Sequence, residues 1–285
     1  MPKDRLAWVC LGYLYVVWGT SYLANSYVLQ SMPPLLMAGL RFTLAGLILF
    51  MVSPAPSQPV PTLARWAASG VGVLLLGVGS GGVVYAQQSV DSSLAAISVA
   101  SVGLWTVVFS RLLGQPVALR DWQGVALGLV GVALVNADGG LQASPRGALA
   151  LLLGAACWGL GSVLMRHLPM PPGLLSGAHQ LLAGGIVLLL AGGLRGERLQ
   201  AWPSLLSTLA FFYLLIAASL LAFSAYTYLI RHVKPSLATS YAYVNPVVAV
   251  VLGGQLADEA VSPQAYLGLG MILLALIFIA RGRSS

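Results

Sequence analysis

Charged residues are scarce in this chain of 285 residues, and acidic residues are the scarcest. Asp and Glu together number 7 and Lys and Arg 14, so charged residues make up 7% of the sequence, against 58% hydrophobic residues. Soluble domains carry roughly 25% charged residues. The deficit excludes an ordinary soluble domain and predicts an integral membrane protein.

Apart from Asp121 at the start of the run 120–137, acidic residues are also missing from the apolar runs that we interpret as membrane spans. Exporters that exchange protons for cationic drugs usually need a buried carboxylate, so this absence argues against a multidrug-cation exporter. Both cysteines, Cys10 and Cys157, lie inside apolar runs and indicate no disulfide framework. No spacing typical of metal ligands occurs, and we expect neither a cofactor nor a catalytic residue.

Long apolar runs alternate with short breaks that carry turn residues, such as Met32-Pro-Pro34 and the proline-rich segment 53–61. A membrane-spanning helix needs about 20 apolar residues, so the chain has room for about ten of them. We predict spans at 6–27, 34–53, 66–88, 93–113, 120–137, 146–166, 174–194, 205–230, 236–256 and 263–281.

Basic residues are distributed unevenly between the two ends of the predicted spans. Cytoplasmic loops carry an excess of Lys and Arg, so both termini are predicted to be cytoplasmic. The net charge of +7 is spread over the span ends and not gathered on one element, so no nucleic-acid partner is expected. The expected partners are the lipid bilayer and a small-molecule substrate. The predicted cytoplasmic residues are Lys3, Arg5, Arg65, Arg111, Arg120, Arg166, Arg231, Lys234, Arg281 and Arg283, and those on the opposite side are Arg146, Arg195 and Arg198.

Landmarks of the first half of the sequence recur in the same order in the second half. Val17-Trp18-Gly19 matches Cys157-Trp158-Gly159, and Gly39 to Gly46 matches Gly177 to Gly184, each after a Pro-Pro pair. Hydrophobic helices can resemble one another by chance, but shared landmarks in a shared order favour a true repeat.

Each repeat would hold five spans, the first at 6–137 and the second at 146–281. Because five is an odd number, the second copy would enter the membrane from the other side. The predicted fold class is therefore an all-α polytopic membrane protein, with ten transmembrane helices arranged as two inverted five-helix repeats. Repeats of this kind enclose the substrate site of many secondary transporters.

The ninth predicted span contains the stretch Leu237 to Leu252, which carries two tyrosines, a serine, a threonine, an asparagine and Pro246. A proline inside a helix removes a backbone donor and bends the helix. A weaker copy of the stretch lies 143 positions earlier, where Gly103 corresponds to Pro246. We expect helix bends at Pro246 and Gly103, next to protein or a water-filled cavity that satisfies the exposed polar groups.

Arg41 is the sharpest single candidate for a substrate contact. Counted from Pro34, it lies about 10 Å into the second span at about 1.5 Å per residue. An arginine inside the membrane is costly and marks a functional candidate, and its guanidinium could hold a carboxylate or phosphate through two parallel hydrogen bonds. Alternatively, Arg41 extends to the outer surface or binds loop carbonyls. His179, its counterpart in the second repeat, could titrate near neutral pH, although a lone helix histidine is more often satisfied by a neighbour.

Tyr241 and Asn245 share one face of the ninth span, and Ser98 and Trp105 share the matching face of the fourth. Facing each other across a pseudo-twofold axis, these groups would suit a zwitterionic small molecule. Hydrogen bonding between helices is the alternative role. Aromatic residues also anchor helices at the membrane interface, so the weaker cavity candidates are Trp18, Ser21, Tyr22, Trp158 and Ser162.

Four segments make the chain resemble the EamA-domain family of the drug/metabolite transporter superfamily. They are the Val-Trp-Gly of the first span, Pro33 to Phe42, Phe109 to Gly114 and Leu237 to Val247. The resemblance implies ten helices in two EamA domains, a central cavity, and export of a small metabolite across the bacterial inner membrane. The chain departs from the family pattern in having Gly103 at the bend of the fourth span, where a proline is common.

The leading hypothesis is an alternating-access exporter of a small polar or zwitterionic metabolite, such as an amino acid. A carrier for a sugar, nucleoside or nucleotide derivative is an alternative that would need more basic cavity residues than Arg41. An intramembrane hydrolase is the second alternative, because Gly159-Leu-Gly161-Ser162 resembles a protease serine motif, but His167 lies at the wrong angle on the same helix. Gly124 and Gly128 suit packing within one chain or an oligomer face, so both a monomer and a homodimer stay open.

Overall fold

The computed structural model describes residues 5–115, 117–135, 144–233, 238–256 and 263–281, and every regular element within these ranges is a helix. The first half contains α1 (Arg5–Leu29), α2 (Pro34–Val52), α3 (Thr62–Gly72), the π-helix η1 (Val73–Ser80), α4 (Gly81–Ala86), α5 (Ser92–Val99), α6 (Val102–Leu112) and α7 (Leu119–Val135). The second half contains α8 (Pro145–His167), α9 (Leu174–Leu194), α10 (Leu205–Tyr213), the π-helix η2 (Leu214–Ala222), α11 (Phe223–His232), α13 (Tyr241–Leu256) and α14 (Pro263–Arg281).

Seven helical stretches among the described residues are long and apolar enough to cross a membrane. Many large apolar side chains on their outer surfaces are exposed, including Phe50 on α2 and Phe212 on α10, as expected for helices surrounded by lipid. The prediction of an all-helical chain with several membrane spans is therefore confirmed. The seven stretches are Arg5–Leu29, Pro34–Val52, Thr62–Ala86, Leu94–Leu112, Pro145–His167, Leu174–Leu194 and Leu205–His232.

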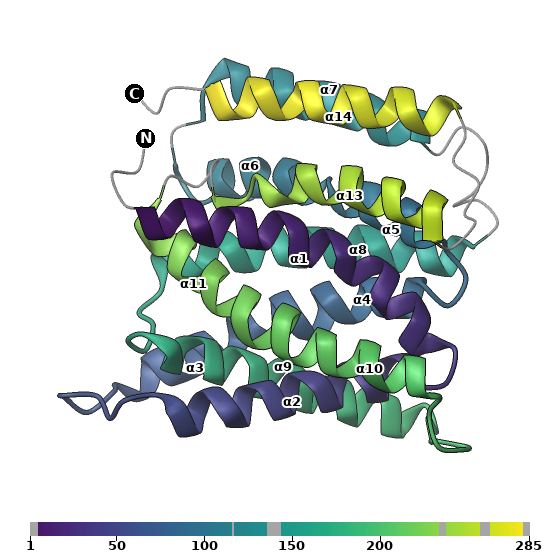
Figure 1. Cartoon of the computed structure of the whole chain (residues 1–285). Helices are drawn as coiled ribbons and strands as arrows, with labels where there is room; N and C mark the ends of the chain where they lie inside the picture. Colours follow the sequence, from purple (N-terminus) through teal and green to yellow (C-terminus); the bar gives the residue numbers. More distant parts are fainter. Residues whose placement is uncertain (1–4, 116, 136–143, 234–237, 257–262, 282–285) are drawn as a thin grey trace.

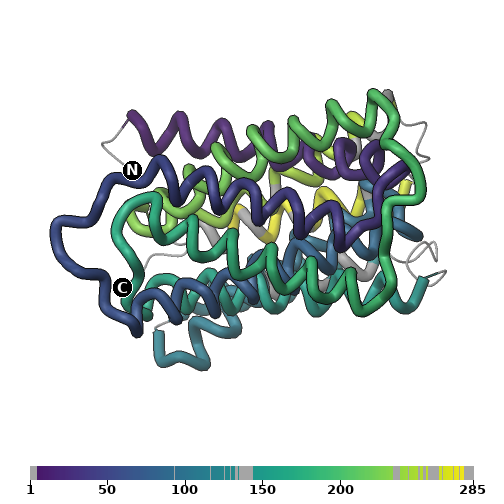
Figure 2. Tube along the Cα trace, turned by 90° about the horizontal axis from the view of Figure 1, so that it is seen from below, coloured from purple at the N-terminus to yellow at the C-terminus, as the bar shows by residue number. Residues whose placement is uncertain are grey.

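The helices run lengthwise beside one another, and helices of the two halves are intermingled (Figure 1). At one side of the bundle α2 packs along α9, and at the opposite side α7 packs along α14 (Figures 1 and 2). Among the other helices, α1, α8, α11 and α13 lie between these two pairs (Figure 1). α1 begins and α14 ends at the same end of the bundle (Figure 1).

The turn residues start the helices where the sequence predicts breaks. Pro34 and Pro145 occupy the first turns of α2 and α8, where a missing N–H costs nothing. Ser144 caps α8 by accepting a hydrogen bond from the Gly147 N–H at 3.2 Å, and Ser204 caps α10 through the Ser207 N–H at 3.2 Å.

Glycines allow the central helices to approach one another closely. A Cβ added at Gly19 of α1 would lie 2.6 Å from the Cβ of Val248 in α13, and one added at Gly159 of α8 would lie 2.8 Å from the Cβ of Trp105 in α6. Close packing of small residues stabilises helix association in a membrane, where no hydrophobic driving force acts between helices. The two Trp-Gly motifs of the sequence therefore mark tight helix crossings.

The contacts of the two halves correspond to one another. α1 packs against α13 and against η2 and α11, while α8 packs against α6 and against η1 and α4. Both halves also contain a π-helical stretch at a similar place, namely η1 between α3 and α4 and η2 between α10 and α11. The sequence analysis did not anticipate the π-helices, in which backbone hydrogen bonds span one residue more than in an α-helix.

The fourth predicted span is interrupted at Ala100 and Ser101, between α5 and α6. Gly103 lies just after this interruption, and the Leu104 N–H reaches back to the Ser101 carbonyl at 2.9 Å, the tighter spacing of a 3₁₀ turn. In the ninth predicted span Pro246 lies inside α13, which begins after a turn at Thr239 and Ser240. Helix bends at Gly103 and Pro246 themselves stay predictions.

Candidate functional site

A central cavity lies between the two halves and receives side chains from both. Its empty volume, including the part open to solvent, is about 770 Å³. Seven of the predicted site residues line the cavity: Trp18, Ser21, Tyr22, Arg41, Trp158, Tyr241 and Asn245. The π-helices also contribute lining residues, which are Leu76, Gly79 and Ser80 from η1 and Ala218 and Ser219 from η2.

Four of the predicted site residues do not line this cavity, namely His179, Trp105, Ser98 and Ser162. His179 is half-buried and its ring meets that of Phe50 edge to face at 6.0 Å, so it packs against α2. The ring of Trp105 stacks on Phe109 at 5.9 Å. Ser98 is buried, and its hydroxyl makes no hydrogen bond among the described residues. On the same helices the cavity is lined instead by Leu181, Val99 and Val102.

Arg41 is almost fully buried at the cavity wall, with 5% of its surface exposed. Its guanidinium carbon lies 4.4 Å from the centre of the Phe42 ring, and Nη1 donates to Asn25 Oδ1 at 3.4 Å. Nε–H has no partner, and no carboxylate of the described residues forms an ion pair with Arg41. The guanidinium therefore carries a charge that is not compensated by a nearby acid.

Two buried amides connect Arg41 to the protein backbone. Asn25 Nδ2 donates to Gln87 Oε1 at 3.1 Å, and Gln87 Nε2 donates to the main-chain carbonyl of Tyr22 at 2.9 Å. Asn25 lies in α1 and Gln87 at the end of α4, so the chain of bonds joins three elements. Asn25 and Gln87 were not among the predicted site residues, although an amide inside an otherwise apolar span indicates a polar partner.

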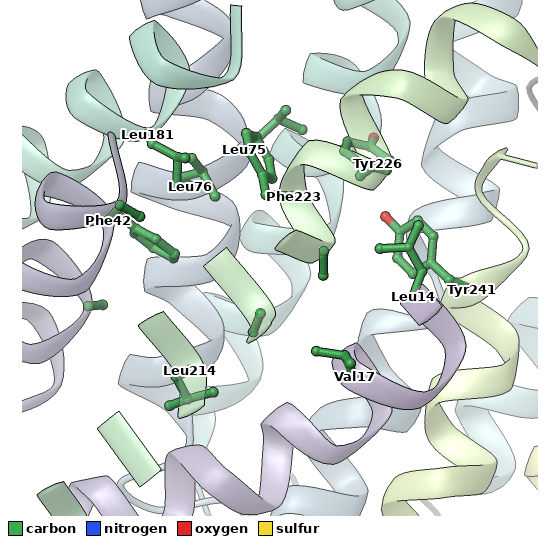
Figure 3. Close-up of a cluster of buried hydrophobic side chains, with 14 of the residues drawn as sticks. Leu14, Val17, Phe42, Leu75, Leu76, Leu181, Leu214, Phe223, Tyr226 and Tyr241 are labelled. Atoms are coloured by element: carbon green, nitrogen blue, oxygen red, sulfur yellow. The ribbon is translucent and has the colours of Figure 1, made fainter. Parts of the chain in front are cut away.

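An aromatic layer lies beside the cavity, which three of its members, Trp18, Trp158 and Tyr241, line. It consists of Trp18, Trp158, Tyr226 and Tyr241, whose ring centres lie 4.6 Å to 5.9 Å apart in mostly edge-to-face and tilted contacts. Figure 3 shows Tyr226 and Tyr241 close to one another on separate helices, with Phe42, Leu76 and Leu181 grouped on the other side of the view. The layer joins α1, α8, α11 and α13.

Hydrogen bonds hold the aromatic layer in place. The Tyr226 hydroxyl bonds to Ser162 Oγ at 2.7 Å, and Trp18 Nε1 donates to the carbonyl of Ala218 in η2 at 3.1 Å. Asn245, with its amide nitrogen turned toward them, donates to the carbonyls of Tyr15 at 3.3 Å and Tyr241 at 3.0 Å. These bonds fix the layer to both halves of the chain.

Several polar atoms of the cavity residues lack a well-formed hydrogen bond among the described residues. They are Arg41 Nε, Trp158 Nε1, Ser219 Oγ and Tyr241 Oη. Buried polar groups in proteins are nearly always satisfied by protein or ordered water. The cavity thus offers hydrogen-bonding groups, beside an uncompensated cation and aromatic faces, to whatever occupies it.

Ser162, the serine of the protease-like segment, forms hydrogen bonds with residues other than a histidine. Ser162 Oγ bonds to the Trp158 carbonyl at 2.7 Å and to the Tyr226 hydroxyl. The His167 ring bonds to the Val163 carbonyl and to Gln115, each at 2.9 Å. The described structure therefore contains no Ser162–His167 pair of the kind that nucleophilic catalysis requires.

A bundle of apolar helices that encloses a cavity with a few polar groups, lined by residues of both halves, is the architecture of a multi-pass membrane carrier. The profile of the EamA-like transporter family matches residues 6–137 and again residues 145–281. The chain belongs to the EamA-like transporter family, as the resemblance seen in its sequence indicated.

Relatives of known sequence agree with this assignment. The chain is 43% identical over 272 residues to the inner membrane transporter YedA of Escherichia coli (strain K12), covering 95% of this chain and 89% of that protein. It is 28% identical over 271 residues to the protein PecM of Dickeya dadantii (strain 3937), covering 94% of this chain and 90% of that one. A probable amino-acid metabolite efflux pump of Salmonella typhimurium is 25% identical over 165 residues, covering 55% of this chain and 53% of that protein.

The fold itself has a solved counterpart. A crystal structure with 22% sequence identity superimposes with a TM-score of 0.72 and covers 97% of this chain and 96% of its own. Together with the family match and the apolar helices, these comparisons identify a multi-pass transport protein of the inner membrane.

Proposed function

We propose that this chain is an alternating-access secondary transporter that exports a small polar or zwitterionic, amino-acid-like metabolite across the inner membrane. The observation that carries the proposal is the buried, uncompensated guanidinium of Arg41 at the wall of the central cavity. An arginine at the centre of a membrane helix costs about 2.5–3.5 kcal/mol on insertion scales, so a function is expected to offset that cost.

A substrate carboxylate is the partner that Arg41 lacks. The guanidinium has five donors in a planar fork that matches a carboxylate, and among the described residues one of them is used, in a long bond to the neutral oxygen of Asn25. A carboxylate that replaces water there forms charge-assisted hydrogen bonds and neutralises the site.

The rest of the cavity suits the remainder of such a molecule. Trp18, Trp158 and Tyr241 present aromatic surface that can contact an apolar side chain or hold an ammonium group over a ring face. Ser219 Oγ makes no hydrogen bond among the described residues and can bond to a polar substituent. The printed name of the Salmonella relative, a probable amino-acid metabolite efflux pump, supports the same substrate class.

We further propose that the two halves are inverted five-helix repeats, which would make ten transmembrane helices with α7, α13 and α14 as three of them. The corresponding contacts of α1 and α8, and the π-helix in each half, support this organisation. Rocking of one repeat against the other would expose the cavity to each side of the membrane in turn. The excess of basic residues at the span ends on the side of the two termini supports the placement of both termini in the cytoplasm.

Comparison of culture media identifies the substrate. Metabolites are measured without preselection in medium from cells that overproduce the protein and from cells that lack it. A carboxylate-bearing metabolite that accumulates outside only the overproducing cells is then tested in proteoliposomes with and without a proton gradient. The proposal predicts saturable flux that requires Arg41, and the matched control is Arg195→Ala, because Arg195 is exposed and lies outside the cavity. Flux of a sugar or nucleotide derivative and not of a carboxylate metabolite would favour the alternative carrier.

A further inference from the structure

A chain of hydrogen bonds joins the Tyr22 carbonyl to Arg41 through Gln87 and Asn25, and each donor and acceptor in it is determined. A main-chain carbonyl can only accept, so Gln87 must present its NH₂ group to Tyr22 and its Oε1 to Asn25. Asn25 must then donate with Nδ2, which leaves Oδ1 facing Arg41. The carbonyl of Tyr22 thus determines, through two amides, that a neutral oxygen and not an NH₂ group meets the guanidinium.

Burial makes this arrangement rigid. Asn25 and Arg41 are each 5% exposed and Gln87 is 9% exposed. In so apolar an environment a satisfied network is strong, and breaking one member leaves the others unpaired. The chain therefore holds one edge of the guanidinium in a fixed position, while Nε–H stays unpaired at the cavity wall.

The amide at position 25 also determines the charge of the cavity. Asparagine and aspartate have the same shape, but an aspartate at this place would form an internal ion pair with Arg41 and leave the cavity without net charge. Asn25 supports Arg41 without neutralising it. Asn25 thus holds Arg41 in place without supplying a negative charge, and the ligand must supply that charge.

We propose that Asn25 and Gln87 are positioning residues that keep Arg41 as an uncompensated cation and thereby make the cavity selective for a single anionic head group, a carboxylate. The meaning of this selectivity for export rests on the proposed function. Binding of the anion itself does not, and it can be measured without transport.

Benzoate and benzamide are suitable probes, because they share a planar shape and a ring that can pack on Trp18 and Trp158 but differ in charge. Thermal unfolding of the purified full chain in detergent is followed over a range of probe concentrations, since a ligand that binds only the folded state raises the melting temperature. The proposal predicts that benzoate stabilises the wild-type chain and that benzamide does not.

The variants separate positioning from general damage. Asn25→Asp and Gln87→Leu are each expected to raise the apparent Kd for benzoate at least about tenfold, the equivalent of one lost charge-assisted hydrogen bond. Their matched controls are Gln88→Glu and Gln88→Leu, which make comparable changes one residue from Gln87 on an exposed side chain. These controls are expected to leave the Kd for benzoate unchanged.

Equal stabilisation of the wild type by benzoate and benzamide, or none by benzoate, would overturn the proposal. So would an unchanged Kd for benzoate in Asn25→Asp. If Asn25→Asp gives no cooperative unfolding transition, Gln87→Leu decides: a Kd equal to that of Gln88→Leu rejects the positioning role. Discrimination of benzoate from benzamide without metabolite flux in proteoliposomes would instead reject the proposed export function and leave this inference standing.

Discussion

Removal of the Arg41 side chain is expected to abolish flux of a carboxylate substrate while the chain still folds and inserts. Among the described residues Arg41 has one hydrogen bond, to Asn25 Oδ1 at 3.4 Å, and no acidic partner, so its loss leaves one amide oxygen unpaired and the bonds of Asn25 to Gln87 and of Gln87 to Tyr22 intact. A carboxylate held by two charge-assisted hydrogen bonds gains about 1.5–3 kcal/mol from each. Their sum of about 3–6 kcal/mol corresponds to a loss of affinity of about 10²- to 10⁴-fold in Arg41→Ala.

The assay is the initial rate of uptake into proteoliposomes as a function of the concentration of the exported metabolite. Arg41→Lys keeps the charge but not the planar fork, so its affinity for the substrate is expected to lie between that of the wild type and that of Arg41→Ala. Arg195→Ala controls for the removal of an exposed arginine, whose guanidinium rests over the Tyr85 ring at 4.9 Å. Equal rates for Arg41→Ala and the wild type would refute the assignment of Arg41 to the substrate site.

Three further changes test other parts of the structure. Pro246→Ala restores a backbone donor inside α13 and is expected to lower the turnover number more than the substrate affinity, as measured by flux and by binding; an unchanged turnover number would limit Pro246 to packing. Gly72→Ala places a Cβ on the main chain of Gln180 and is expected to destabilise the fold by about 1–3 kcal/mol, whereas Gly70→Ala, with no neighbouring atom within 4 Å, should leave the melting temperature nearly unchanged. Tyr226→Phe removes the 2.7 Å bond to Ser162 and leaves that hydroxyl only its bond to the Trp158 carbonyl, so a loss of about 1 kcal/mol is expected in chemical unfolding; an unaltered midpoint would mean that the bond adds no net stability.

The sequence predicted those features that depend on local chemistry. The proline pair Pro33-Pro34 lies at a predicted break, and α2 begins there, at Pro34. The two Trp-Gly motifs were recognisable as landmarks, and the structure brings Trp18 and Trp158 to 5.6 Å from one another. A buried arginine could also be recognised, because a charge inside an apolar run is conspicuous in any sequence.

The rotation of each helix could not be predicted in the same way. In a membrane the outer face of a helix is as apolar as the inner face, so hydrophobic periodicity does not distinguish them. His179 was predicted to lie at the cavity because it corresponds to Arg41 in the second repeat, but its ring packs against Phe50 and Leu181 of the same helix lines the cavity. The partnership of Asn25 with Gln87 links residues 62 positions apart, which no local pattern reveals.

The π-helices η1 and η2 could not be predicted from the sequence either. The residues of η1 and η2 are ordinary helix formers and glycines, and nothing in their spacing departs from an α-helix. The side-chain bond from Trp18 to the Ala218 carbonyl is a tertiary contact that accompanies the wider backbone of η2. Such elements depend on contacts between helices and become visible only in three dimensions.

Access to the cavity from both sides of the membrane is the most direct test of alternating access. Ser219 lines the cavity with an unpaired hydroxyl, so Ser219→Cys, made in a chain whose Cys10 and Cys157 are replaced by serine, places a thiol there. The measurement is its rate of reaction with a membrane-impermeant maleimide added to one side at a time. We predict reaction from either side, slowed on both by the exported metabolite; reaction from one side only, under all conditions, would contradict alternating access.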